Sequence, residues 1–570
     1  MAKSYEAIVI GTGFGGAINA CRLSKKWPGG VLVLERGKRY ALGAFPRTPH
    51  DMARNFWNQG SEKRRRPKAV SGIEQQGLFD IRNYKKIDVV LAAGLGGGSL
   101  IYANVFLEPP DEAFSPRWPA SCRKAQLRPY YDICKEVLGA RPIPPMQGRR
   151  HITRTALFEK VAQQIGRNSK LVDINVFFGK DFADPLAPGV QQQNRYGALQ
   201  TSCTYCGECD VGCNYQAKNT LDLNYLHQAE TKYQAEIRTE HLVDRIVPVD
   251  KDGRDDPGAG GEHGYRVYYR DLGRAKEELS AVANRVVVSA GSLGSTELLL
   301  RCRDRFRTLP RVSQTLGRHF SGNGDFLAFV AGTREPANRN YGPVITQRID
   351  FNLFQNFAPD HAFILEDASY PVFGAWFVEG AKPGFLHLAA LWRLVRHWVA
   401  RLRGNTMGSI GYAFADALSG DISYKTCVLL FMGIDKSNGT MTLGSDGWLE
   451  LDWPQRDSAA LYDAILAAGK QFRQQTGAEI FFALPNWWWP FRKNVSVHAL
   501  GGCVLSDNPA EGVTSAEPKT FGQVHGYRNL YVADGAIVPN AVGANPTATI
   551  SALSEMVAQG ITGIAPTAAL

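Results

Sequence analysis

Long hydrophobic runs are missing from this 570-residue sequence. No stretch of about 18 uninterrupted apolar residues occurs, which argues against a membrane-spanning helix. The chain also has no internal repeat and no long low-complexity segment. No secretory or twin-arginine signal precedes the first strand candidate at Tyr5, so we expect a cytoplasmic protein. The length suggests about two to four domains, and the composition, 21% charged and 44% hydrophobic, is that of a globular protein.

Acidic residues are fewer than basic ones, and the chain carries a net charge of +11. Part of the excess is concentrated at Lys63–Lys68 and at Arg393, Arg396, Arg401 and Arg403. Clusters of this kind can contact nucleic acid, but no nucleic-acid module signature accompanies them. We therefore predict a solvated basic surface and no nucleic-acid partner.

The first structured segment is the most informative one. Residues Tyr5–Gly16 (YEAIVIGTGFGG) pass from an apolar strand into a G-x-G-x-x-G turn. In such a turn Gly11 permits the tight bend and Gly13 lets the backbone approach a pyrophosphate. Gly16 lets the following helix, Ala17–Lys26, pack closely. Phosphate would then lie at the N-terminus of that helix.

An acidic residue follows at the expected distance. The second strand candidate, Val31–Leu34, ends at Glu35, which is placed to bind a ribose. A glycine triplet alone would be weak evidence in a chain with 58 glycines, and an ordinary βαβ unit without ligand is the alternative. Strand, turn, helix, strand and acid nevertheless occur in the required order, which favours a dinucleotide site.

Cysteine is unevenly distributed. Four of the ten cysteines fall within eleven residues, at Cys203, Cys206, Cys209 and Cys213, and disulfides are uncommon in large cytoplasmic proteins. The spacing C-x2-C-x2-C-x3-C is that of bacterial ferredoxins. We predict an iron–sulfur cluster, 3Fe-4S or 4Fe-4S. A structural zinc site, a reduced metal-free loop and a disulfide remain the alternatives.

The remaining patterns divide the chain into alternating parts. Val286–Ala290 is a buried-type strand, whereas alternating apolar and polar runs between residues 322 and 495, such as Thr426–Ile434, indicate antiparallel strands. Helices are expected at Phe385–Arg403 and Ser458–Thr476. We therefore expect nucleotide-binding parts at 1–110, 226–321 and 496–570, an excursion with the cysteines at 111–225, and a substrate domain at 322–495.

Several motifs together resemble those of the glucose-methanol-choline (GMC) flavin oxidoreductases. Beside the N-terminal fingerprint they are GLGGGS at 94–99, VSAGSLGSTELLL at 288–300, HALGGCVL at 498–505 and NLYVADGAIVPNAVGANPTATISAL at 529–553. The segment Cys203–Leu221 is similar to one in the intracellular cholesterol-oxidase-like branch, and the triplet C-x5-C-x3-C to the ligands of iron–sulfur glucose dehydrogenase subunits. The resemblance implies an α/β plus α+β fold: an FAD-binding Rossmann-type domain with an inserted substrate domain on an antiparallel sheet.

The resemblance also implies FAD as the cofactor and assigns its contacts. Glu35 would bind the adenosine ribose. The other positions that the motifs assign are Gly11, Gly13, Phe14 and Gly16 at the pyrophosphate, Gly97, Gly98, Ser99 and Asn104 beside the isoalloxazine, and Asp534, Gly535, Asn545, Pro546 and Thr547 at the flavin end.

Two residues are the expected catalytic groups. A histidine beside an apolar turn is more often structural, but the resemblance places His498 over the flavin with Asn545 as its partner. Histidine can accept a hydroxyl proton near neutral pH. The expected reaction is oxidation of an alcohol to a carbonyl, on a sterol or another bulky hydrophobic alcohol. The alternatives are a sugar or primary-alcohol dehydrogenase, and a flavin-binding protein without turnover.

One departure concerns a second activity. Secreted cholesterol oxidases place a glutamate over the substrate, on a strand of the second domain. An approximate alignment puts Lys425 or its neighbour there, so no acid is expected and steroid isomerisation is not predicted.

The electron acceptor and the surface contacts are less determined. The acceptor would be O2, or an electron-transfer protein or quinone if an iron–sulfur cluster carries electrons. The amphipathic basic pattern at 385–403 and the aromatic run Trp487–Phe491 fit either core packing or a peripheral membrane contact.

Overall fold

The structure is a computed structural model. It describes residues 4–57, 76–114, 117–145, 151–181, 183–274, 277–338, 341–371, 421–487 and 492–570, together with Val395, Val399 and Leu402.

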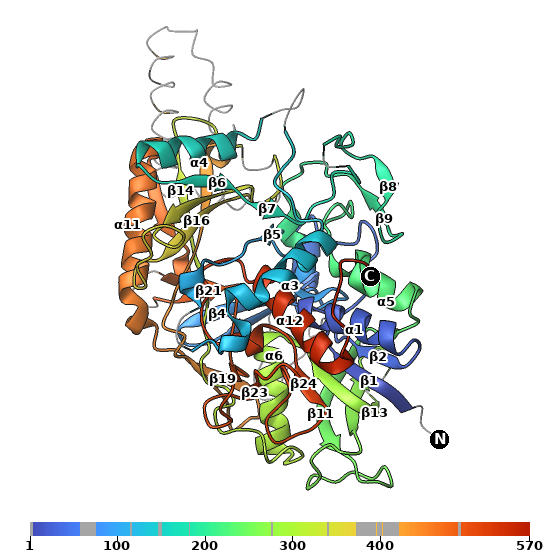
Figure 1. Cartoon of the computed structure of the whole chain (residues 1–570). Helices are drawn as coiled ribbons and strands as arrows, with labels where there is room; N and C mark the ends of the chain where they lie inside the picture. Colours follow the sequence, from blue (N-terminus) through green and yellow to red (C-terminus); the bar gives the residue numbers. More distant parts are fainter. Residues whose placement is uncertain are drawn as a thin grey trace.

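A seven-stranded sheet forms the base of the molecule (Figure 1). Its strand order is β10-β2-β1-β13-β12-β11, with β24 paired to β13. β1, β2, β10, β13 and β24 are parallel, whereas β11 and β12 are antiparallel neighbours. The strands are β1 (Ser4–Ile10), β2 (Val31–Leu34), β10 (Glu236–Arg238), β11 (His241–Pro248), β12 (Tyr265–Asp271), β13 (Glu278–Val288) and β24 (Leu530–Val532). The parallel strands are buried at Ala7–Ile10, Val31–Leu34, Val286–Val288 and Leu530–Val532, as parallel strands covered by helices require. β12 instead alternates between buried and partly exposed residues.

Helices from both ends of the chain cover this sheet. α12 (Thr547–Thr562) packs against α1 (Phe14–Lys26) and α3 (Lys124–Val137), and α1 also contacts α5 (Tyr225–Thr231). Glu555 of α12 accepts hydrogen bonds from Arg22 and Tyr225, each at 2.8 Å. This buried pairing ties the C-terminal helix to the first helix. α6 (Gly291–Leu300) follows β13 and packs against β11 and β18 (Thr440–Leu443).

A second, antiparallel sheet lies beside the first (Figure 1). Its order is β20-β14-β17-β16-β15-β6, and the helices α4 (Thr153–Gln164) and α11 (Ala459–Thr476) pack against it. The strands are β6 (Ser169–Leu171), β14 (Phe326–Ala331), β15 (Gln347–Phe351), β16 (Phe363–Ala368), β17 (Thr426–Gly433) and β20 (Ile480–Ala483). The predicted fold class, a Rossmann-type part with an inserted antiparallel sheet, is confirmed. The boundary at residue 225 stays a prediction, although α4 and β6 from the 111–225 segment join this second sheet.

Short elements complete the described fold. β21 pairs in parallel with β4, so the chain just before His498 lies against the N-terminal part. The others are α2 (Pro49–Arg54), α10 (Asp421–Tyr424), β3 (Phe79–Asn83), β4 (Ile87–Ala92), β5 (Val105–Phe106), β7 (Asp173–Ile174), β8 (Gln191–Gln193), β9 (Leu199–Thr201), β18 (Thr440–Leu443), β19 (Leu449–Asp452), β21 (Asn494–Ser496), β22 (Leu505–Ser506) and β23 (Thr514–Ser515).

Several predicted surface features fall outside the described residues. These are the basic clusters at 63–68 and 393–403, the aromatic residues 488–491 and most of the helix predicted at 385–403. Within that helix, Val395, Val399 and Leu402 are described, and their exposed fractions are 42%, 37% and 70%. In the described part of the chain no helix is long and apolar enough to cross a membrane.

Candidate active site

The G-x-G-x-x-G turn has the geometry of a phosphate cradle. Gly11 has φ +94°, and a Cβ there would lie 2.3 Å from the carbonyl oxygen of Ser289. A Cβ on Gly16 would lie 2.0 Å from the carbonyl oxygen of Gly11, whereas one on Gly13 would meet no atom within 4 Å. α1 starts at Phe14 without a side-chain cap. Its first N–H groups therefore remain available for an anion beside Gly13.

Glu35 lies at the same edge of the sheet. Its Oε2 accepts hydrogen bonds from the amide of Thr12 at 3.1 Å and from the Thr12 hydroxyl at 2.6 Å, and its Oε1 accepts one from the amide of Gly37 at 2.8 Å. Burial raises the pKa of Glu35, while these hydrogen bonds oppose the rise. The carboxyl group is thus held next to the turn, where a ribose attached to the pyrophosphate would lie.

The glycine-rich segment at 94–104 packs directly on this turn. A Cβ on Gly97 would lie 2.6 Å from the Cα of Gly13, and Ser99 donates to the carbonyl of Gly96 at 2.7 Å. Asn104 is fully buried with φ +71°, and in the described part of the chain neither polar atom of its side chain has a hydrogen-bond partner. A buried amide without partners is costly. Asn104 therefore fits a polar group of a bound cofactor.

Asp534 connects the C-terminal part to this site. Its Oδ2 accepts hydrogen bonds from the amide of Gly291 at 2.9 Å and the hydroxyl of Ser295 at 2.5 Å, and its Oδ1 accepts one from the amide of Ala536 at 2.8 Å. Burial raises the pKa of Asp534 to about 6. The carboxyl thus joins the start of α6 to the segment that follows β24.

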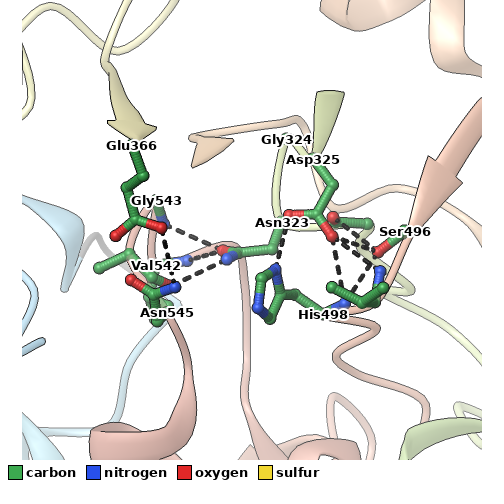
Figure 2. A network of polar contacts seen from close by, with 12 residues as sticks. Asn323, Gly324, Asp325, Glu366, Ser496, His498, Val542, Gly543 and Asn545 are labelled. Carbon is green, nitrogen blue, oxygen red and sulfur yellow. Dashed lines mark hydrogen bonds and ion pairs between the residues drawn. The ribbon is translucent and has the colours of Figure 1, made fainter. Parts of the chain in front are cut away.

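His498 is held by a carboxylate that the sequence analysis missed. Its Nδ1 lies 2.7 Å from Oδ1 of Asp325, which is 3% exposed (Figure 2). The Oδ2 of Asp325 accepts hydrogen bonds from the Ser496 hydroxyl at 2.9 Å and from the amides of Val497 and His498 at 2.9 and 3.2 Å. Nε2 of His498 makes no hydrogen bond within the described ranges.

Asn545 is paired with a second buried carboxyl, that of Glu366 on β16. The Asn545 amide donates to Oε2 of Glu366 at 3.2 Å (Figure 2), while Oδ1 of Asn545 and Oε1 of Glu366 have no hydrogen-bond partner among the residues that the structure describes. Burial raises the pKa of Glu366 to about 8, and the hydrogen bond from Asn545 opposes the rise. Two neighbouring buried oxygen atoms without hydrogen-bond partners indicate a site for a polar group of a ligand.

Glu366 also corrects an expectation. The alignment placed Lys425 where relatives carry an acid, but Lys425 precedes β17, whereas Glu366 lies on the neighbouring strand β16, opposite Leu430. The alignment considered only the segment around Lys425, and Glu366 lies on a different strand. The sequence alone therefore could not identify Glu366 as the acid beside Asn545. An acid is therefore present at the site.

The four clustered cysteines are free thiols. They line one small cavity together with Lys218, whose buried ammonium donates to the carbonyl groups of Leu100, Tyr102 and Cys209 at 3.1, 2.8 and 2.8 Å. In the described part of the chain, no three His, Cys, Asp or Glu side chains are placed to hold a metal ion. The iron–sulfur prediction therefore gains no support from this arrangement, and we derive no electron-transfer step through such a cluster.

A nucleotide cradle, orphaned buried amides and a histidine–carboxylate pair define a dinucleotide-dependent oxidoreductase. Residues 5–319 and 435–554 match the family models described as GMC oxidoreductase. The chain belongs to the GMC oxidoreductase family, and it is an FAD-dependent oxidoreductase that acts on alcohols.

Similar proteins span nearly the whole chain. A cholesterol oxidase of Acinetobacter baumannii is 27% identical over 97% of this chain and 93% of its own length. A cholesterol oxidase of Mycobacterium tuberculosis (strain ATCC 25618 / H37Rv) is 26% identical over 98% and 91%. Among solved structures, a fungal aryl-alcohol oxidase has a TM-score of 0.58 at 14% identity, covering 99% of both chains. Pyridoxine 4-oxidase from Mesorbium loti has a TM-score of 0.60 at 15% identity, covering 97% of this chain and 98% of its own. The two structures support the fold alone.

Proposed function

We propose that this enzyme oxidises a sterol or another bulky hydrophobic alcohol to the corresponding carbonyl compound, with His498 and Asn545 as its catalytic residues. The sterol class is supported by the two cholesterol oxidases that align over more than nine-tenths of their length. The reaction removes the proton of the hydroxyl oxygen and a hydride from the carbon that bears this oxygen, and bound FAD would supply the hydride acceptor.

The geometry of His498 carries the proposal. Because Nδ1 lies 2.7 Å from the Asp325 carboxylate, the ring proton is placed on Nδ1 and the lone pair on Nε2. Nε2 can then accept the hydroxyl proton as the hydride leaves. The resulting imidazolium would be stabilised by the adjacent carboxylate.

Asn545 contributes at the other side of the reacting group. Its amide nitrogen is oriented by Glu366, and its Oδ1 is buried without a partner. This arrangement would let Asn545 hydrogen-bond the substrate hydroxyl or the reduced flavin. An oriented amide that strengthens its hydrogen bond in the transition state lowers the barrier to reaction.

Glu366 favours a second candidate activity. After oxidation, a carboxylate near the new carbonyl could move a proton from the adjacent carbon and shift a double bond, as in steroid isomerisation. A carboxyl whose pKa is raised to about 8 binds and releases protons near neutral pH. Oxidation followed by isomerisation would give a conjugated enone, whereas oxidation alone would not.

O2 is the acceptor that we propose, since the aligned relatives are named oxidases. An electron-transfer protein or quinone would take its place if iron and acid-labile sulfide were found in the purified protein. Hydrogen peroxide formed in proportion to the carbonyl product would support O2. Reduction of a quinone or cytochrome without peroxide would contradict it.

We also propose a peripheral membrane contact for the helix that carries Val395, Val399 and Leu402. Their spacing places three exposed apolar side chains on one helical face. Liposome flotation at low salt, with anionic and neutral vesicles, tests this contact. Absence of flotation with both would remove it from the proposal.

An anaerobic screen of flavin reduction tests the main proposal. Cholesterol, a terpenol, 1-dodecanol and glucose would each be mixed with the FAD-loaded enzyme, and the loss of flavin absorbance followed. We expect reduction by cholesterol or 1-dodecanol and not by glucose. Reduction by glucose alone would favour the sugar dehydrogenase, and reduction by none would favour the flavin-binding protein without turnover.

A further inference from the structure

The short segment Ser321–Asp325 (SGNGD) contacts the surroundings of both His498 and Asn545. It leads into β14 and pairs with the chain just after His498. The amide of Leu500 donates to the carbonyl of Ser321 at 3.0 Å, and the amide of Ser321 donates back to the carbonyl of Leu500, also at 3.0 Å. The segment is therefore held against the histidine loop by backbone pairing before any of its side chains is considered.

We propose that Asn323 and Asp325 are positioning residues that hold the two catalytic groups at a fixed separation. Asp325 orients the ring of His498 and sets its tautomer. Asn323 holds the backbone that presents Asn545. This proposal rests on the catalytic roles proposed above for His498 and Asn545.

The Asp325 side of this arrangement uses both carboxylate oxygens. Oδ1 meets the ring at Nδ1, while Oδ2 accepts three hydrogen bonds, two of them from the backbone of Val497 and His498. The backbone bonds determine where the carboxylate lies, and the ring bond then determines which way the imidazole faces. An ionised carboxylate prefers an N–H donor, so the proton stays on Nδ1.

The Asn323 side works through backbone alone. Asn323 is fully buried with φ +55°. Its Oδ1 accepts hydrogen bonds from the amides of Val542 and Gly543 at 2.9 and 3.0 Å, and its Nδ2 donates to the carbonyl of Ala544 at 2.9 Å (Figure 2). These are the three residues directly before Asn545. Asparagine supplies the acceptor and the donor that this loop needs in one short side chain.

A buried carboxyl fixes the shape of the segment itself. Asp435 accepts hydrogen bonds from the Ser321 hydroxyl at 2.8 Å and from the amides of Gly322 and Gly324 at 3.0 and 3.2 Å. With its backbone held in this way, the segment presents the side chains at 323 and 325 toward two different loops. The positions of His498 and Asn545 are thereby set by one rigid element and not by two independent loops.

The substitution Asp325→Asn tests the histidine side. An amide can donate to Nδ1 and would favour the opposite tautomer, which leaves Nε2 protonated and unable to act as a base. We expect the rate of flavin reduction by cholesterol or 1-dodecanol to fall about 10²–10⁴-fold. Asp244→Asn, which removes a carboxylate of β11 that is paired with Arg270 of β12, is the matched control and should leave this rate unchanged.

A double variant separates a positioning role from general damage. Because Asp325 acts through His498, Asp325→Asn should cost almost nothing further in a His498→Ala background. An additive loss would overturn the proposal. If His498→Ala itself keeps full activity, the proposed function fails first, and the two failures are thereby distinguished.

A spectroscopic arm needs no substrate. In protein labelled with ¹⁵N-histidine, the resonances absent from His498→Ala identify His498. We expect a protonated Nδ1 and an unprotonated Nε2 in the wild-type protein, and loss of this pattern in Asp325→Asn. A wild-type Nε2–H tautomer, or no change in the variant, would contradict the proposal whatever alcohol the enzyme uses.

Asn323→Asp tests the other side. It keeps the acceptor for Val542 and Gly543 but places an oxygen against the carbonyl of Ala544. We expect flavin reduction to slow about 10–100-fold, and little further loss when Asn545→Ala is added. Full activity of Asn323→Asp, or a loss that adds to the loss caused by Asn545→Ala, would overturn the positioning role proposed for Asn323. Asn323→Ser replaces the variant if Asn323→Asp does not retain FAD.

Discussion

Two regions of this protein gather reactive side chains, and they differ in how those side chains are held. His498 and Asn545 are each held by residues far from them in the chain. Asp325 lies 2.7 Å from the His498 ring, Glu366 accepts a hydrogen bond from Asn545 at 3.2 Å, and Asn323 donates to the carbonyl of Ala544 at 2.9 Å. In the cysteine segment, four thiols come from eleven consecutive residues, and no three ligands are placed to hold a metal within the described residues. Closeness in the sequence therefore brings the thiols near one another. The geometry of the catalytic groups depends instead on hydrogen bonds to residues that are far away in the sequence.

The largest expected difference between the regions is in the rate of flavin reduction. His498→Ala should lower the rate constant about 10²–10⁴-fold, because the proton acceptor is lost, while FAD content stays unchanged. The rate is measured by anaerobic stopped-flow at the flavin absorbance maximum.

Cys213→Ser is the matched variant in the other region. It should leave flavin reduction unchanged, since the side-chain partners of His498 and Asn545 among the described residues are the carboxyl groups of Asp325 and Glu366. An equal loss in Cys213→Ser would break the comparison. A loss confined to turnover with an external acceptor would instead assign the cysteine segment to electron transfer.

A smaller effect is expected for Glu366→Gln and concerns stability. The pKa of Glu366 is raised to about 8 in the folded protein from a usual value of 4.5. The folded state therefore holds its proton more tightly than the unfolded state, and the wild type loses stability as pH rises from about 4.5 to about 8. Glutamine does not titrate, so the variant does not lose stability in this way. The melting temperature of the variant minus that of the wild type should therefore rise as pH increases across this range, and it should be constant above about pH 8. Parallel melting curves from pH 5 to 9, at equal FAD saturation, would contradict the raised pKa.

The smallest effect is an order of reactivity among the thiols. Cys206 and Cys213 are half-buried, whereas Cys203 and Cys209 are buried. In native protein we expect a maleimide to label the first pair before the second. Reaction at Cys206 should be slower than at a solvent-exposed thiol, because burial raises its pKa. Mass spectrometry of timed samples gives the order. Protection of all four thiols until acid releases iron would restore the iron–sulfur prediction.

Features that depend on neighbours in the chain could be predicted from the sequence. The turn at Gly11–Gly16, the strand Val31–Leu34 and the acid at Glu35 lie within one βαβ unit, so their order along the chain is also their order in space. Both the dinucleotide site and the α/β class could be predicted from this local pattern. The prediction of an antiparallel second sheet held for a similar reason, because alternating burial is a property of each strand.

Prediction was weaker where contacts cross the chain. Asp325 lies 173 residues before His498, and Glu366 lies 179 residues before Asn545. No spacing rule relates residues at such separations, and each carboxylate reaches its partner through a loop or strand that is placed by sheet pairing.

By itself, therefore, the sequence determined the family, the nucleotide cradle and the two candidate catalytic residues, because each is written in a short motif. Only the tertiary structure decided which carboxylates orient those residues and how the segment at 321–325 joins them. The physical reason is that motifs specify backbone shape over a few residues, whereas the protonation and direction of a buried side chain depend on groups supplied by the whole fold.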